Sequence, residues 1–111
     1  MTPRYQQFDD FWLFYLREHS RPATRLLHYI GTTLAVAALV AALVDGRLAW
    51  LLLFPVAGYL FAWIAHFAVE RNRPATFTYP LWSLGADFRM WFLWLTGRLA
   101  PELVRAGLPP R

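Results

Sequence analysis

The sequence has no cysteine, no lysine and few charged residues of either sign. Without cysteine the chain can form no disulfide, thiolate metal site or thiol nucleophile, so any metal site must use histidine and carboxylate side chains. Charged residues make up 16% and AVILMFWYC residues 58% of the 111 residues, whereas soluble domains average about a quarter charged. A water-soluble fold of this length could not bury so much apolar surface. The composition favours a membrane protein.

Two long segments contain no charged residue. Residues 26–44 and 48–69 span nineteen and twenty-two positions and are separated only by Asp45, Gly46 and Arg47. A helix of roughly 20 apolar residues crosses the hydrocarbon core of a bilayer. The sequence therefore predicts a transmembrane helical hairpin.

A shorter helix is predicted on each side of this hairpin. Residues 5–19 place apolar side chains at the helical spacing i, i+3, i+4, and these are Phe8, Phe11, Trp12, Tyr15 and Leu16. Residues 82–99 form a second such stripe that also carries charges, and Pro74 and Pro80 indicate a loop before it. We expect both helices to lie on the membrane face or re-enter it, with four crossings as the alternative. The predicted fold is an all-α membrane domain over residues 1–100, followed by a flexible tail at 101–111.

The arginines predict the orientation of the hairpin. Seven of them flank it on the side of the two termini, namely Arg4, Arg17, Arg21, Arg25, Arg71, Arg73 and Arg89, and Arg47 sits at the tip. The positive-inside rule places both termini in the cytoplasm. Most of these arginines are expected to contact lipid phosphates, and no nucleic-acid partner is predicted.

Three histidines are predicted to meet near the cytoplasmic interface. His28 lies 18 residues before Gly46 and His66 lies 20 residues after it, so their heights along the hairpin differ by about 3 Å. His19 ends the first amphipathic helix close to the same level. Glu70 follows His66 at i+4 and would share its helix face.

This group has two interpretations. A single intramembrane histidine could simply bond a neighbouring carbonyl, but three together favour a functional site. Imidazoles with a carboxylate and no thiolate suit Zn²⁺ or non-haem Fe²⁺, and Glu70 and Asp87 are the candidate carboxylate ligands.

Three further polar residues lie near the ends of the predicted spans. Arg25 and Arg73 are the candidates for binding a substrate carboxylate in a bidentate geometry. Asn72 could orient a site residue, but the turn interpretation is favoured.

Two long strings resemble a known family. FWLFYLREHSRPATRLLHYIGT and GYLFAWIAHFAVERNRPATFTYPLWSLGADFRM are similar to the membrane family typified by the fungal 2-hydroxy fatty acid dioxygenase of phytosphingosine breakdown, which has bacterial members. The resemblance implies an Fe²⁺-dependent α-oxidation in which O₂ and a long-chain 2-hydroxy fatty acid give an acid one carbon shorter. It also implies His19, His28 and His66 as metal ligands and, for a bacterial member, the inner membrane. The alternative is a non-catalytic lipid-binding or scaffold protein with structural histidines.

Overall fold

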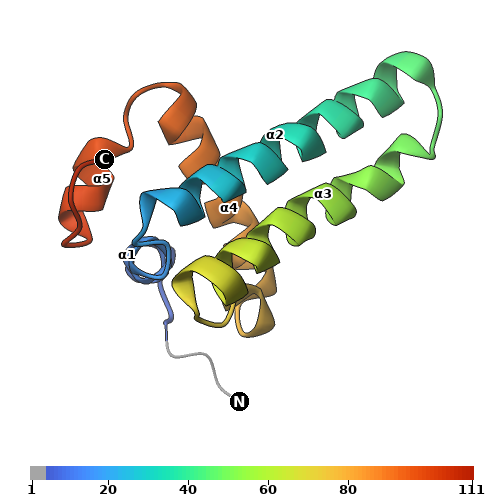
Figure 1. The fold of residues 1–111 in the computed structure, drawn as a ribbon. Coiled ribbons are helices and arrows are strands. Elements are labelled where there is room, and N and C mark those ends of the chain that lie inside the picture. Colours follow the sequence, from blue (N-terminus) through green and yellow to red (C-terminus); the bar gives the residue numbers. More distant parts are fainter. Residues whose placement is uncertain (1–4) are drawn as a thin grey trace.

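The computed structural model describes residues 5–111, and the regular secondary structure in that range is helical (Figure 1). Arg4, one of the arginines used for orientation, lies outside the described residues. The elements are α1 (Phe8–Arg17), α2 (Pro22–Asp45), α3 (Trp50–Ile64), the π-helix η1 (Ala65–Glu70), the 3₁₀ helix η2 (Ala75–Phe77), α4 (Pro80–Leu95) and α5 (Ala100–Arg105). The predicted all-α fold is confirmed.

The predicted hairpin consists of α2 and of α3 continued by η1. These helices run side by side and extend beyond the others (Figure 1). Gly46 ends α2 in the left-handed conformation, with a φ of 72°, and its N–H donates to the Ala42 carbonyl at 2.9 Å. Within the described part of the chain, only Pro22–Asp45 and Trp50–Glu70 are long and apolar enough to cross a membrane. α1 has ten residues and α4 has sixteen, so both are shorter than these two spans of 24 and 21 residues.

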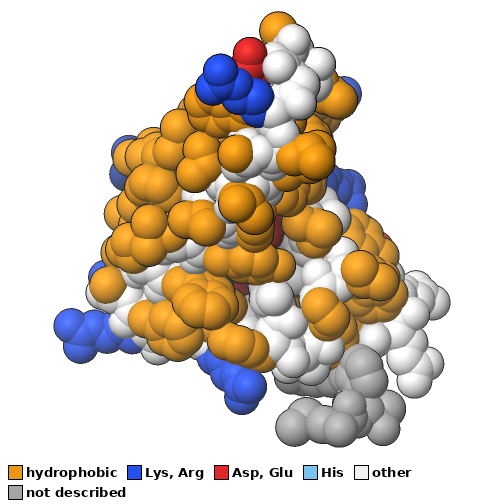
Figure 2. Space-filling model, turned by 90° about the vertical axis from the view of Figure 1, so that its right-hand side faces the viewer, with side chains coloured by type: hydrophobic (Ala, Val, Ile, Leu, Met, Phe, Trp, Pro, Cys, Tyr) orange, Lys and Arg blue, Asp and Glu red, His pale blue; other side chains and the backbone are white. Residues whose placement is uncertain are grey.

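Large hydrophobic side chains remain exposed along the hairpin. Val44 is 84% exposed, Leu43 79% and Leu52 72%. Figure 2 shows hydrophobic side chains covering most of one face of the molecule, with basic side chains towards its edges. Such a surface suits hydrocarbon rather than water, because a patch of this extent is rare on soluble monomers.

The two long helices approach closely at Gly31. A Cβ added there would lie 2.9 Å from the Phe61 Cβ and 3.0 Å from the Ala57 carbonyl oxygen. Small residues at such positions allow membrane helices to pack with their backbones in contact. Gly31 therefore sets the separation of α2 and α3.

Replacing Gly31 by alanine is expected to separate the two helices and to destabilise the protein by about 1–3 kcal/mol, the usual cost of overpacking. Gly58→Ala is the matched control, because a Cβ at Gly58 meets nothing within 4 Å. The free energy of unfolding in detergent can be compared for the two variants. Equal stability of both would contradict a close contact at Gly31.

The aromatic core lies at the base of the hairpin rather than inside it. The predicted apolar stripe of α1 is buried there, with Phe11, Trp12, Tyr15 and Leu16 at most 1% exposed and Phe8 partly buried. On α4, Ser83, Ala86 and Met90 are buried, at the i, i+3, i+7 spacing of one helix face. The core thus fixes α1 across the end of the hairpin.

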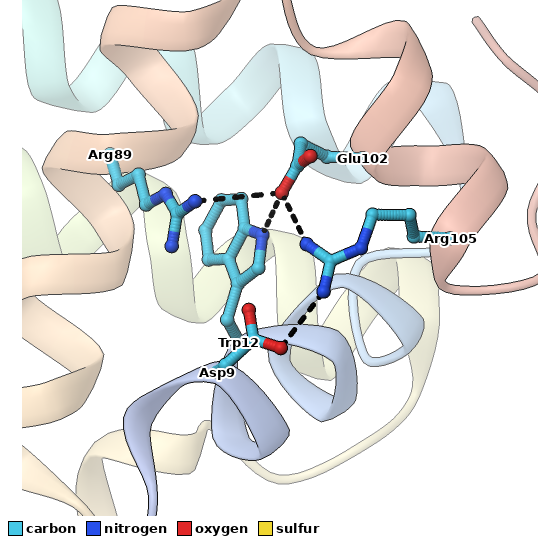
Figure 3. Close-up of polar contacts among 5 residues, drawn as sticks. All are labelled: Asp9, Trp12, Arg89, Glu102 and Arg105. Carbon is cyan, nitrogen blue, oxygen red and sulfur yellow. Dashed lines mark hydrogen bonds and ion pairs between the residues drawn. The ribbon is translucent and has the colours of Figure 1, made fainter.

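The segment from residue 101 onward, expected to be a flexible tail, begins as helix in the structure. α5 packs on α1, with Leu103 2% and Ala106 6% exposed. One oxygen of Glu102 accepts hydrogen bonds from the Trp12 indole and from Arg105, each at 2.9 Å (Figure 3). Arg105 also pairs with Asp9 at 2.8 Å. These contacts depend on where α1 lies in the fold. The periodicity of the six residues of α5 could not reveal them from the sequence.

Candidate metal centre

Three histidines from three different elements meet at the base of the hairpin. His19 follows α1, His28 lies in α2 and His66 lies in η1, and all are at most 4% exposed. One ring nitrogen from each lies within 4.8 Å of the other two. The structure therefore brings together the histidines that the sequence placed at one membrane level.

Backbone carbonyls determine which ring nitrogen of two histidines carries the proton. The Nδ1 of His19 lies 2.6 Å from the Tyr15 carbonyl oxygen, and the Nδ1 of His28 lies 3.0 Å from that of Thr24. A carbonyl can only accept, so each Nδ1 must donate. In the neutral ring, Nε2 is then unprotonated and available as a ligand.

Asn72 has the same effect on His66. Its Oδ1 lies 2.6 Å from the His66 Nδ1, and its Nδ2 donates to the Glu18 carbonyl at 3.0 Å. The second bond orients the amide, so Oδ1 accepts from the histidine and leaves its Nε2 free. The sequence favoured a turn residue at Asn72, and the structure makes it a positioning residue for His66.

The free nitrogens face one another. The Nε2 atoms of His19 and His28 are 3.0 Å apart, and when both lack a proton their lone pairs repel. Burial lowers the pKa of His19 well below its usual value, and the neighbouring His28 and His66 lower it further. Protonation is thus disfavoured, whereas a metal ion prefers neutral imidazole. The donor set fits a divalent transition metal such as Zn²⁺ or Fe²⁺.

The π-helix places His66 and Asn72 together. π-Helical turns, closed by i→i+5 bonds, often occur at functional sites. Arg71 ends η1 in the left-handed region with a φ of 60°, and the Asn72 N–H donates to the His66 carbonyl at 2.9 Å. The chain thereby folds back, so that the Asn72 side chain reaches the ring of His66.

Glu70, a predicted ligand, is the last residue of η1, and its side chain reaches the N-terminus of α2. Its carboxylate accepts from the Ser20 hydroxyl at 3.0 Å, the Arg21 N–H at 2.5 Å and the Thr24 hydroxyl at 3.0 Å. A negative charge at a helix N-terminus is favourable because of the helix dipole. Its position supports a capping role.

Replacing Glu70 by glutamine is expected to lower the free energy of unfolding by about 1 kcal/mol, typical of a lost cap, and to leave metal binding intact. The control is Glu18→Gln, because burial and the nearby Glu70 raise the pKa of Glu18 and removing that charge should not destabilise the fold. Denaturation and metal content are measured on both variants. Loss of the metal in the Glu70 variant would instead support ligation.

Asp87, the other predicted carboxylate ligand, pairs with Tyr15. The Tyr15 hydroxyl donates to the Asp87 carboxylate, and its ring stacks on His19 with centroids 4.1 Å apart. Burial raises the pKa of Asp87 to about 7, although the hydrogen bond from Tyr15 lowers it. Asp87 lies outside the three-histidine group but borders a pocket that also contains His28.

The two arginines proposed to bind a substrate carboxylate lie in different surroundings. Arg25 is buried and donates to the carbonyls of His19 at 2.7 Å and Ser20 at 3.0 Å, and also to that of Arg111. It therefore holds the loop that carries His19. Arg73 is exposed and stacks over the Phe77 ring at 4.8 Å.

Comparison with known proteins identifies the family. The family model described as 2-hydroxy-palmitic acid dioxygenase Mpo1-like matches residues 5–99, and the chain belongs to this family. No curated protein and no solved structure matches this chain. The matched range contains all three histidines and Asn72.

Proposed function

We propose that this member of the Mpo1-like family is an Fe²⁺-dependent dioxygenase that shortens a long-chain 2-hydroxy fatty acid by one carbon. The three buried imidazoles carry this proposal, because each has a Nε2 left free by an Nδ1 hydrogen bond. The family description, which names 2-hydroxy-palmitic acid, supports the substrate class.

His19, His28 and His66 would hold the metal, and the protein around them fixes their orientation. The carbonyls of Tyr15 and Thr24 and the amide of Asn72 keep each ring in one tautomer. Three protein ligands leave coordination positions open, and bound Fe²⁺ would supply redox chemistry with O₂ and a template for the hydroxyl and carboxylate of the substrate. Burial of the rings excludes water from the site.

A position at the end of a membrane hairpin suits this substrate. The acyl chain can remain among the exposed hydrophobic side chains of α2 and α3 while the polar head reaches the histidines. The excess of arginine on the side of the termini supports a cytoplasmic location of this end. We place the protein in the bacterial inner membrane, with lipid, the 2-hydroxy acid and O₂ as its partners.

The test is turnover of 2-hydroxypalmitate by protein purified in detergent and loaded with Fe²⁺ or with Zn²⁺. We expect an acid one carbon shorter from the iron-loaded protein in air, because the reaction requires an oxidant. The Zn²⁺-loaded protein and an anaerobic sample should give none. Turnover that is equal with and without oxygen, or with either metal, would exclude the dioxygenase.

A further inference from the structure

A pocket of about 210 Å³ lies between α2, α3 and α4, next to the histidines. Its lining includes His28, Thr32 and Ala35 on α2 and continues over residues of α3 and α4, among them Pro55, Gly58, Asp87 and Phe88. His28 and Ala35 are seven residues apart on one helix, which corresponds to about 10 Å along its axis. The pocket therefore runs from the metal centre toward the middle of the hairpin.

The lining changes in character along this path. His28 and Asp87 mark the end at the metal centre, because Asp87 accepts a hydrogen bond from Tyr15, whose ring stacks on His19. The rest of the lining is mainly aliphatic and aromatic and includes Ala35, Phe54 and Phe88. A ligand with a small polar head and one apolar chain matches this order, because ligand sites combine an apolar lining with a few polar groups that fix orientation.

Gly58 makes room for such a ligand. A Cβ built there meets nothing within 4 Å, although the residue lies in the middle of α3 and borders the pocket. The carbonyl of Gly58 is 3.5 Å from a Cβ added at Gly31, so Gly58 lies opposite a residue that is about one helical turn from His28 on α2. A larger side chain at Gly58 would project into the space directly after the head-group end.

We infer that this pocket binds the acyl chain of the 2-hydroxy acid next to its head group, and that Gly58 is a specificity-determining residue that keeps it open. The inference rests on the proposed function for the identity of the ligand. The occupant is a single substrate chain that continues from the metal centre, since His28 belongs to both the centre and the pocket wall.

The experiment compares Gly58→Leu with Gly85→Leu in the full-length protein. Gly85 is an exposed glycine of α4 with nothing within 4 Å of an added Cβ, and it does not line the pocket. A 2-hydroxy fatty acid carrying a diazirine in its chain is photo-crosslinked to each variant, and labelled peptides are identified by mass spectrometry. Gly58→Ala provides a side chain of intermediate size at this position. Metal content is measured to check that each variant keeps its metal centre.

Wild type and Gly85→Leu should be labelled on peptides containing residues 54–59 or 84–88. In Gly58→Leu the labelling of these peptides should fall about tenfold or more, while the metal is retained. Unlabelled 2-hydroxypalmitate should compete, whereas excess phospholipid should not. Equal labelling of both leucine variants, or competition by phospholipid alone, would overturn the inference. If wild type shows the expected labelling but turns over no 2-hydroxy acid, the proposed reaction fails while the acyl pocket stands.

Discussion

Alanine at any one of His19, His28 and His66 is expected to remove nearly all bound iron and to abolish turnover. Each ring supplies one nitrogen to a buried group within 4.8 Å, so no single loss can be compensated by the other two. Loss of a residue that only orients a ligand typically costs 10–100-fold in metal affinity. We expect the loss of a ligand itself to exceed about 100-fold.

Asn72→Ala provides the graded comparison for these variants. It removes the acceptor of the His66 Nδ1 hydrogen bond but leaves all three rings, so its affinity for iron should fall by about 10–100-fold. Iron content by elemental analysis and helix content by circular dichroism are measured for each variant. Full iron occupancy in any one histidine variant with native helix content would show that this ring is not a ligand.

Truncation of Trp12 to alanine is expected to produce the largest loss of stability, about 3–5 kcal/mol, as is typical for a buried tryptophan. Trp12 is fully buried, its indole donates to Glu102, and the Arg89 guanidinium lies 4.6 Å from the ring centre (Figure 3). The substitution would leave a cavity between α1 and α4 and remove the contact that ties α5 to α1.

Trp50→Ala is the matched truncation at an exposed site. Trp50 lies at the start of α3 near the hairpin tip and is 37% exposed. Its indole N–H donates to the carboxylate of the exposed Asp45. Its loss should cost less than about 1 kcal/mol, as is usual for surface residues. The free energy of unfolding of both variants is measured in the same detergent. Similar losses of stability in the two variants would contradict a core centred on α1.

Regular helix geometry made the histidine group predictable from sequence. A short turn and a constant rise place His28 and His66 at one height, and the amphipathic pattern of α1 brings His19 to the same level. The apolar runs predicted the hairpin for a similar reason, because the length and composition that make a helix a candidate for crossing a membrane can be seen directly in the sequence.

Local departures from α-helical geometry were not predictable. The expectation that Glu70 shares a face with His66 assumed an α-helix, but residues 65–70 form a π-helix whose turn is wider. The role of Asn72 depends on Arg71 in a left-handed conformation that non-glycine residues adopt only occasionally. Neither feature has a clear signal in the sequence.

The fate of molecular oxygen tests the central claim most directly. Conversion of a 2-hydroxy acid and O₂ to the acid one carbon shorter, CO₂ and water removes four electrons from the substrate, and a dioxygenase, unlike an oxidase, also transfers oxygen atoms from O₂ to its products. Iron-loaded protein supplied with ¹⁸O₂ and 2-hydroxypalmitate should therefore yield a shortened acid whose carboxylate carries one labelled oxygen, and the His66→Ala variant should yield none. A shortened acid labelled only from ¹⁸O-water, or no shortened acid from iron-loaded wild type, would contradict the assignment.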